Sequence, residues 1–376
     1  MSDHPQSPRS FALSYISNSR FHRSFTFDSA TTSGPLKVTY GEYGRVPNER
    51  DTVPTLLLMP GMYSSRYIGI CLHAIADKCG VRVVVVDRPG MGNSTDVALA
   101  QRVSAWIETV PRLLAHLNIQ HVSLASHSAG TIYLLNTLYH CRDILRPDKP
   151  MATLLAPWVD PAKSGITTMK MAQYIPTPAF KLWHHIPRLF LQEGSPIAMS
   201  GAAVAKFSAN LPSKSNDNQA KNRRYIAEKY ALTVDQQKEI DSAMMQAMFQ
   251  EDTVGSNSEA LQCLRKEANT WGNCEDYEVF VRELVEVERA RDGPPLRVKV
   301  FFGESDSMIG KKGQDYFEET WGQTRGGDLG GVVEFESTTV AGTDHDSLVQ
   351  SAEVWESIFR EMGTVEDDII VQHLCS

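Results

Sequence analysis

The chain has 376 residues, of which 42% are hydrophobic and 22% are charged, which is ordinary for a folded globular protein and suits one elaborated domain. Its formal net charge of −8 argues against nucleic acid as a partner, because binding to phosphates needs a basic face. No stretch approaches the ~20 apolar residues that a membrane-spanning helix requires, so stable membrane insertion is not expected.

The N-terminus and the cysteines together predict a cytoplasmic location. Residues 1–9 are polar and contain no apolar region of the kind found in a signal peptide. The six cysteines are scattered along the chain without the spacing of metal ligands. This pattern fits a reducing compartment and predicts no metal site.

The N-terminal part of the chain alternates short apolar runs with amphipathic segments. Residues 1–20 are expected to be a flexible arm, and residues 21–28 and 36–44 alternate apolar and polar positions like a hairpin at the edge of a sheet. The strands expected next are 54–59, 81–87, 121–126 and 151–157, with helices at 66–79, 97–117 and 129–142. Residues 21–159 are therefore predicted to form the first part of an α/β core, with a parallel sheet covered on both faces.

The regular alternation stops after Pro157. Residues 160–290 contain no convincing buried strand, and prolines interrupt their helix-like segments. We therefore expect a helical insertion here, whose Met and aromatic side chains mainly pack it onto the core. Strand-like runs return at 296–302 and 332–336, so residues 291–376 are expected to complete the α/β core.

The segment Ser126–Gly130 lies between an apolar run at 121–125 and a helix-like run at 131–138. A serine with small residues two positions away on either side, at a strand-to-helix turn, is typical of a nucleophile elbow. Such a turn is tight, so its flanking positions carry little bulk. The hydroxyl of Ser128 is then expected at a helix N-terminus, which favours a developing anion. In this chain Ser126 takes the place of the usual first glycine.

Two further polar residues follow expected strands in the C-terminal part. Asp306 ends the segment Gly303–Asp306, directly after the run 296–302, and His345 follows the last strand-like run. A histidine and a carboxylate are the groups that activate a serine hydroxyl, which is a weak nucleophile without an adjacent base. Asp160, which follows the preceding strand, is the alternative acid.

Other motifs follow the earlier strands, namely a glycine turn at 59–62 and the loop Asp87–Ser94. With serine, acid and histidine each just past an expected strand, the chain resembles the α/β-hydrolase superfamily from about Phe25 to Met362. The resemblance implies an α/β-hydrolase fold, with a mostly parallel sheet and an N-terminal antiparallel hairpin. It also implies that residues 160–290 are a helical cap that covers the active site.

The resemblance implies a role for each site residue. Ser128 would be the nucleophile, His345 its general base, and Asp306 the residue that orients the imidazole. The oxyanion hole would consist of the backbone N–H groups of Met62 and Ala129. Many relatives have His-Gly in the turn before the first of these donors, where this chain has Pro-Gly.

These residues predict a serine-dependent hydrolase that cleaves an ester, thioester or related acyl bond through an acyl-enzyme. The expected substrate is a small, largely apolar acyl compound, and no cofactor is expected. The elbow and the segment Ala156–Trp158 resemble those of uncharacterised hydrolases of filamentous fungi. One alternative is therefore an acyl-transfer or cyclisation enzyme of fungal secondary metabolism that uses the same triad. A second is a non-catalytic protein that binds a small ligand on the same fold. The sequence predicts no oligomeric state.

Overall fold

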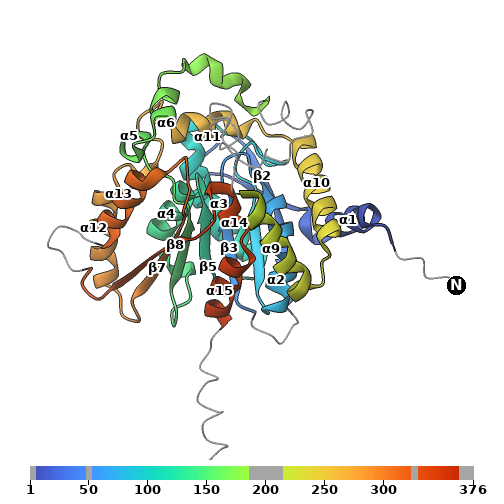
Figure 1. The fold of residues 1–376 in the computed structure, drawn as a ribbon. Coiled ribbons are helices and arrows are strands. Elements are labelled where there is room, and N and C mark those ends of the chain that lie inside the picture. Colours follow the sequence, from blue (N-terminus) through green and yellow to red (C-terminus); the bar gives the residue numbers. More distant parts are fainter. Residues whose placement is uncertain (1–5, 48–52, 186–214, 323–328, 364–376) are drawn as a thin grey trace, which may run out of the picture.

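The strands of the chain come together in one sheet (Figure 1). The structure, a computed structural model, describes residues 6–47, 53–185, 215–322 and 329–363, and within them eight strands have the order β1-β2-β4-β3-β5-β6-β7-β8. The strands are β1 Arg23–Asp28, β2 Pro35–Gly44, β3 Thr55–Met59, β4 Arg82–Val86, β5 Ser123–His127, β6 Met151–Leu155, β7 Leu296–Gly303 and β8 Val333–Val340.

The directions of the strands confirm the predicted fold class. β1 and β2 form an antiparallel hairpin, and β2 is also antiparallel to β4. The strands β3 to β8 all run parallel to one another. The architecture is therefore that of an α/β-hydrolase, with a mostly parallel sheet and an N-terminal hairpin.

Helices cover both faces of the sheet because the side chains of its central strands are apolar on both faces. In β3, Leu57 belongs to one hydrophobic cluster, whereas Leu56 and Leu58 belong to another on the opposite face. The helices of the first cluster include α3 Arg102–His116, α4 Gly130–His140, α12 Tyr277–Arg289 and α13 Gly310–Gly322, and those of the second include α2 Gly69–Lys78 and α15 Ala352–Gly363. Among the described residues, no helix is long and apolar enough to cross a membrane.

The N-terminal segment differs from the expected flexible arm. Helix α1, Pro8–Ile16, is capped by Ser7, whose side chain accepts a hydrogen bond from the Ser10 N–H. Ala12 is completely buried, and α1 packs against α10, Val234–Gln250. The partner of α1 lies far along the chain, so no local pattern in the sequence reveals that this segment is docked.

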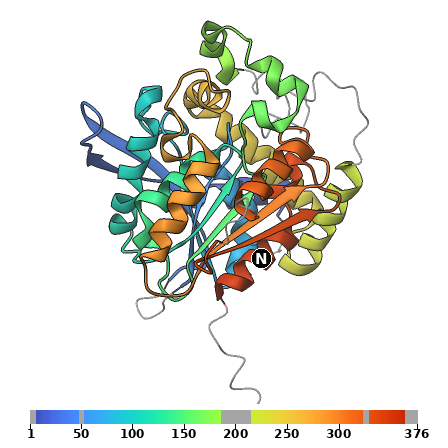
Figure 2. The ribbon, with the colours of Figure 1, turned by 90° about the vertical axis from the view of Figure 1, so that its left-hand side faces the viewer.

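The described part of residues 160–290 contains helices and no strand, as predicted. Its helices are α5 Pro161–Ser164, α6 Thr167–Ala172, η5 Thr177–His185, α9 Ser215–Tyr230, α10, α11 Gly255–Cys263, η6 Gly272–Cys274 and α12. They occupy different places around the core: α9 contacts α2 and α12 contacts α13, whereas α5, α6 and α11 lie together at one end of the sheet (Figures 1 and 2). The assignment of residues 160–290 to one separate cap stays a prediction.

Helix α11 is one part of the insertion that contacts the segments at the carboxyl ends of the parallel strands. The Gly255 N–H donates to the Gly90 carbonyl, which follows β4, at 2.8 Å. The indole N–H of Trp158, which follows β6, donates to the Cys263 carbonyl at 3.0 Å. This end of the sheet is where the loops of an open α/β fold form their binding sites.

The docking of α1 can be tested by placing a charge on either side of the helix. Ala12→Asp buries a carboxylate without a partner, so we expect it to lower the free energy of unfolding by about 1–3 kcal/mol. Leu13→Asp is the matched control, since Leu13 is 48% exposed and its replacement should change stability by less than about 0.5 kcal/mol. Urea denaturation measures both, and equal effects would contradict the docked helix.

Candidate active site

Ser128 lies in a sharp turn between β5 and α4. Its φ is +49°, in the left-handed region that residues other than glycine rarely adopt. Its N–H donates to the Leu155 carbonyl at 3.1 Å. A Cβ at Gly130 would lie 2.2 Å from the Met59 carbonyl oxygen, so only glycine fits there. Ser126 is completely buried within β5. The neighbouring strands thus lie so close to the elbow that Ser126 and Gly130 are small.

Ser128, His345 and Asp306 form a continuous hydrogen-bonded chain. The Ser128 Oγ lies 2.8 Å from the His345 Nε2, and the His345 Nδ1 lies 2.7 Å from the Asp306 Oδ2. Because a carboxylate only accepts, the Nδ1–H of His345 donates to Asp306, and the neutral ring accepts the serine hydroxyl hydrogen at Nε2. All three side chains are buried. The structure thus brings together three residues that lie far apart in the sequence.

The interaction between His345 and Asp306 shifts their pKa values in opposite directions. Burial lowers the pKa of His345, but the negative charge and hydrogen bond of Asp306 outweigh it and raise this pKa above its ordinary value. Burial raises the pKa of Asp306, but His345 and the backbone N–H groups of Met308 and Ile309 bring it below its ordinary value. Asp306 is therefore suited to stabilise a positive charge on the imidazole.

The alternative acid, Asp160, has a different place in the structure. Its carboxylate caps α5 by accepting a hydrogen bond from the Ala162 N–H at 2.8 Å, and it lies 3.3 Å from the Nε of Arg265. The partner of the His345 imidazole is Asp306. The geometry thus favours Asp306 over Asp160 as the residue that orients the histidine.

The two N–H groups expected to bind an oxyanion lie beside Ser128. Gly61, just before Met62, is so close to the elbow that a Cβ there would lie 3.3 Å from the Ser128 Cβ. Ala129 follows Ser128 and precedes α4. Within the described residues, neither the Met62 nor the Ala129 N–H donates a hydrogen bond to the protein. Buried backbone N–H groups are rarely left without a partner, so these two are candidates for contact with a ligand.

His127 and Arg88 are residues of the site whose roles the sequence does not reveal. The His127 Nε2–H donates to the His345 carbonyl at 2.9 Å, and burial, assisted by the charge of His345, lowers the pKa of His127 to about 3. This imidazole is therefore neutral and holds the backbone of the neighbouring histidine. Arg88 donates to the carbonyls of Pro60 and Gly61. In the sequence, only the position of Arg88 in the loop Asp87–Ser94 indicates that it belongs to the site.

No group of three or more His, Cys, Asp or Glu side chains that could hold a metal ion occurs in the part of the chain that the structure describes.

Residues 56–356 match the model of a family described as the alpha/beta hydrolase family. The chain belongs to the alpha/beta hydrolase family. The elbow and the hydrogen-bonded chain of Ser128, His345 and Asp306 lie within the matched residues.

Solved structures share the fold of this alpha/beta hydrolase. A thermophilic esterase from Thermogutta terrifontis is 15% identical, with a TM-score of 0.50, and the match covers 90% of this chain and 97% of that one. A carboxylesterase of the thaumarchaeon Nitrososphaera gargenis is 13% identical, and the esterase RhEst1 from Rhodococcus sp. is 16% identical. Both have a TM-score of 0.51, with 90% of this chain and 97% of the other covered. A search of curated protein sequences finds no match.

The pKa of His345 tests the contact with Asp306. Asp306→Asn removes the largest of the charges that raise this pKa, whereas the smaller raising effects of Asp346 and Asp344 and the lowering effect of burial remain. We therefore expect the pKa to fall. Titration of isotope-labelled histidines by nuclear magnetic resonance measures the change. Asp160→Asn is the matched control and should leave the His345 titration where it is. An unchanged titration in Asp306→Asn would contradict the assigned pairing.

Proposed function

We propose that this alpha/beta hydrolase cleaves a carboxylic ester or thioester through an acyl-enzyme formed on Ser128. The observation that carries the proposal is the chain of two hydrogen bonds, 2.8 Å from Ser128 to His345 and 2.7 Å from His345 to Asp306, at the turn where β5 meets α4. A serine, a base and an orienting carboxylate in this order are the parts required for acyl transfer to a serine oxygen.

In the first half of the reaction, the Ser128 Oγ attacks the acyl carbonyl carbon while its proton passes to the His345 Nε2. The imidazolium that results is stabilised by Asp306, which stays ionised. When the tetrahedral intermediate collapses, its bond to the leaving group breaks and the His345 Nε2–H donates the proton to the departing alcohol or thiol. The products of this half are the acyl-enzyme and the free leaving group.

In the second half, a water molecule takes the place of the leaving group. The His345 Nε2 accepts a proton from the water, whose oxygen attacks the acyl carbonyl carbon. Collapse of the second tetrahedral intermediate breaks the bond to Ser128, and the proton returns to the serine oxygen. The carboxylic acid leaves, and the three side chains are restored.

The backbone N–H groups of Met62 and Ala129 would stabilise both intermediates. Each intermediate carries a negative charge on the former carbonyl oxygen, and donors held in place without solvent stabilise such a charge strongly. The absence of a protein acceptor for either N–H supports this role within the described residues. The N-terminus of α4 adds its partial positive charge at the same place.

The surroundings of the site support an apolar acyl group. The hydrophobic cluster that contains Ala129 also includes large apolar side chains, namely Met62, Trp158, Phe180, Met308 and Ile309. These residues follow β3, β6 and β7 or belong to η5, so they approach the carboxyl end of the sheet from several elements. A small, largely apolar acyl compound fits such surroundings better than a charged one.

The insertion supports the proposal of a cap over this apolar site. Its elements η5 and α11 contact each other, and α11 lies against the segments that follow β4 and β6. The sequence alone supports two further predictions, namely a cytoplasmic location and a role in secondary metabolism.

The neighbours in structure support ester hydrolysis as the reaction class, since they include esterases. Acyl transfer or cyclisation would use the same acyl-enzyme, with another nucleophile in place of water. A protein that only binds a ligand needs no hydrogen-bonded Ser-His-Asp chain, so the geometry supports an enzyme over that alternative.

A fluorophosphonate probe tests the proposed nucleophile. The probe reacts only with activated serines, so we expect one adduct per chain on the wild-type protein and none on Ser128→Ala. Ser126→Ala is the matched control, since this serine lies two residues away within β5 and should leave labelling intact. Intact-mass spectrometry measures all three. An unlabelled wild-type protein, or a Ser128→Ala variant that is still labelled, would contradict the proposal.

A further inference from the structure

A buried ion pair connects the insertion to the turn that carries the proposed oxyanion donor. Arg88 follows β4, and Glu259 belongs to α11 of the insertion. The Arg88 Nε lies 2.5 Å from one Glu259 carboxylate oxygen, and an Nη lies 2.9 Å from the other. Both side chains are completely buried. Charged side chains are almost never fully buried unless they are paired, so Glu259 accounts for the burial of Arg88.

The other side of the same guanidinium holds the backbone of the turn. One Arg88 Nη donates to the Pro60 carbonyl, and the other donates to the Gly61 carbonyl at 2.8 Å. Arginine can make these contacts together because its five N–H donors lie in one plane in fixed directions. The pairing with Glu259 holds that plane. The Gly61 carbonyl also accepts a hydrogen bond from the Ser64 N–H at 3.0 Å, so Arg88 and the turn itself together hold this carbonyl.

The Gly61 carbonyl and the Met62 N–H belong to one peptide unit. Within the described residues there is no cis peptide bond, and in a trans peptide the C=O and the N–H point in opposite directions. When Arg88 holds the carbonyl on one side, the N–H is therefore directed to the other side. Hydrogen bonding at the carbonyl also polarises the peptide unit and makes its N–H a stronger donor.

Two further contacts limit the movement of this turn and of the ion pair. Tyr63 is completely buried at a φ of +63°, and its hydroxyl donates to the Trp183 carbonyl of η5 at 3.0 Å. On the far side of Glu259, Arg102 of α3 lies 3.1 Å from the carboxylate and is itself completely buried. The turn is thus held by two elements of the insertion, η5 and α11.

We infer that Arg88 and Glu259 are positioning residues, through which the insertion sets the direction of the Met62 N–H in the oxyanion hole. The inference rests on the proposed function, because it assigns these residues to the same reaction. Neither residue needs to touch the substrate. The pair would stabilise the tetrahedral intermediates more than the bound ester, since only the intermediates carry a full charge on the oxygen.

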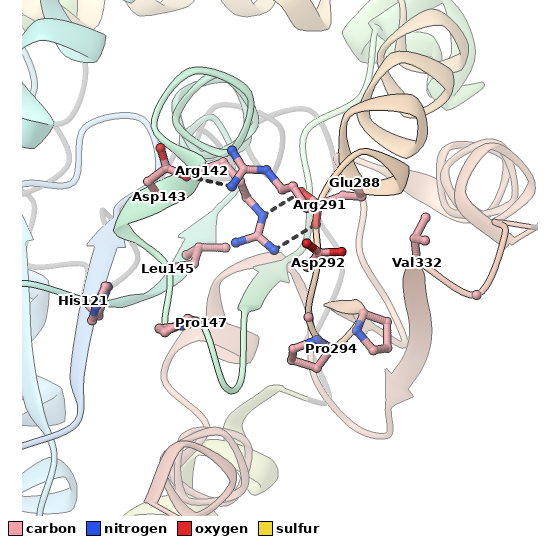
Figure 3. A pocket seen from close by; sticks show the side chains of 13 residues that line it. His121, Arg142, Asp143, Leu145, Pro147, Glu288, Arg291, Asp292, Pro294 and Val332 are labelled. Carbon is pink, nitrogen blue, oxygen red and sulfur yellow. Dashed lines mark hydrogen bonds and ion pairs between the residues drawn. The ribbon is translucent and has the colours of Figure 1, made fainter.

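The test compares Glu259→Gln with a matched buried pair at the other end of the sheet. Arg142 and Glu288 form a similar pair, at 2.6 and 2.8 Å, beside a pocket of about 180 Å³ (Figure 3). His121 and Val332, which precede β5 and β8, also line this pocket, so it lies at the amino ends of the parallel strands, away from Ser128. Glu288 belongs to α12, so this pair also joins residues 160–290 to the core. Glu288→Gln is therefore the control for a loss of stability alone.

Two readouts separate positioning from stability. The first is hydrolysis of p-nitrophenyl butyrate, with kcat and KM measured separately. The second is inhibition by an alkyl trifluoromethyl ketone, which adds to the serine and places an oxyanion in the hole. We expect Glu259→Gln to lower kcat by about 10–100-fold, to change KM by less than about threefold, and to weaken the inhibitor by the same factor as kcat. Glu288→Gln should change none of the three by more than about threefold.

Arg88→Lys keeps the test falsifiable if Glu259→Gln does not fold. A lysine keeps the positive charge but has no planar set of donors that can hold Glu259 and the Gly61 carbonyl together, so we expect the same pattern of kinetic changes. Equal losses in Glu259→Gln and Glu288→Gln, or an unchanged inhibitor affinity in the Arg88 or Glu259 variant, would overturn the inference.

The labelling of the wild-type protein distinguishes the two proposals. If fluorophosphonate fails to label wild-type Ser128, the proposed function fails, and the positioning role fails with it. If the wild-type protein is labelled and Glu259→Gln is labelled at the same rate, the proposed function stands and only the positioning role is overturned. Slower labelling of Glu259→Gln, with unchanged labelling of Glu288→Gln, supports the proposed function and the positioning role.

Discussion

The site depends on the turn between β5 and α4, where there is no room for a side chain at Gly130. The backbone of Ser128 has a positive φ, and Gly130 lies against the carbonyl of Met59. Strain of this kind costs about 1–3 kcal/mol and persists only where the surrounding structure enforces it. Here the neighbouring strands β3 and β6 hold the turn, because the Ser128 N–H donates to the Leu155 carbonyl of β6 and Gly130 lies against the Met59 carbonyl of β3. The tight turn places the Ser128 Oγ within hydrogen-bond distance of the His345 Nε2.

The elements around this turn contribute by holding particular groups in place. β7 is followed by Asp306, β8 is followed by His345, and the insertion reaches the turn after β3 through Arg88 and Tyr63. The groups that would meet the substrate are thus supported by buried polar contacts. Buried and paired charges are costly to separate, so such contacts keep one arrangement of the site.

The sequence predicted the fold class, and it predicted Ser128, Asp306 and His345 as site residues because each follows a strand-like run, a signal that local patterns carry. It did not predict the docking of α1 or the buried contact between Glu259 and Arg88. The Arg88–Glu259 contact joins residues 171 positions apart, and no local pattern records such a contact. The insertion was expected to be helical, but the positions of its helices around the core follow from packing that only the structure shows.

We propose that the peptide between Gly61 and Met62 directs its N–H to the oxygen of a tetrahedral adduct on Ser128. A crystal structure of the protein after reaction with a fluorophosphonate tests this orientation. We expect phosphorus bonded to the Ser128 Oγ, with the phosphoryl oxygen about 2.7–3.1 Å from the N–H nitrogens of Met62 and Ala129. An adduct on another residue, or a phosphoryl oxygen turned away from both nitrogens, would contradict this arrangement.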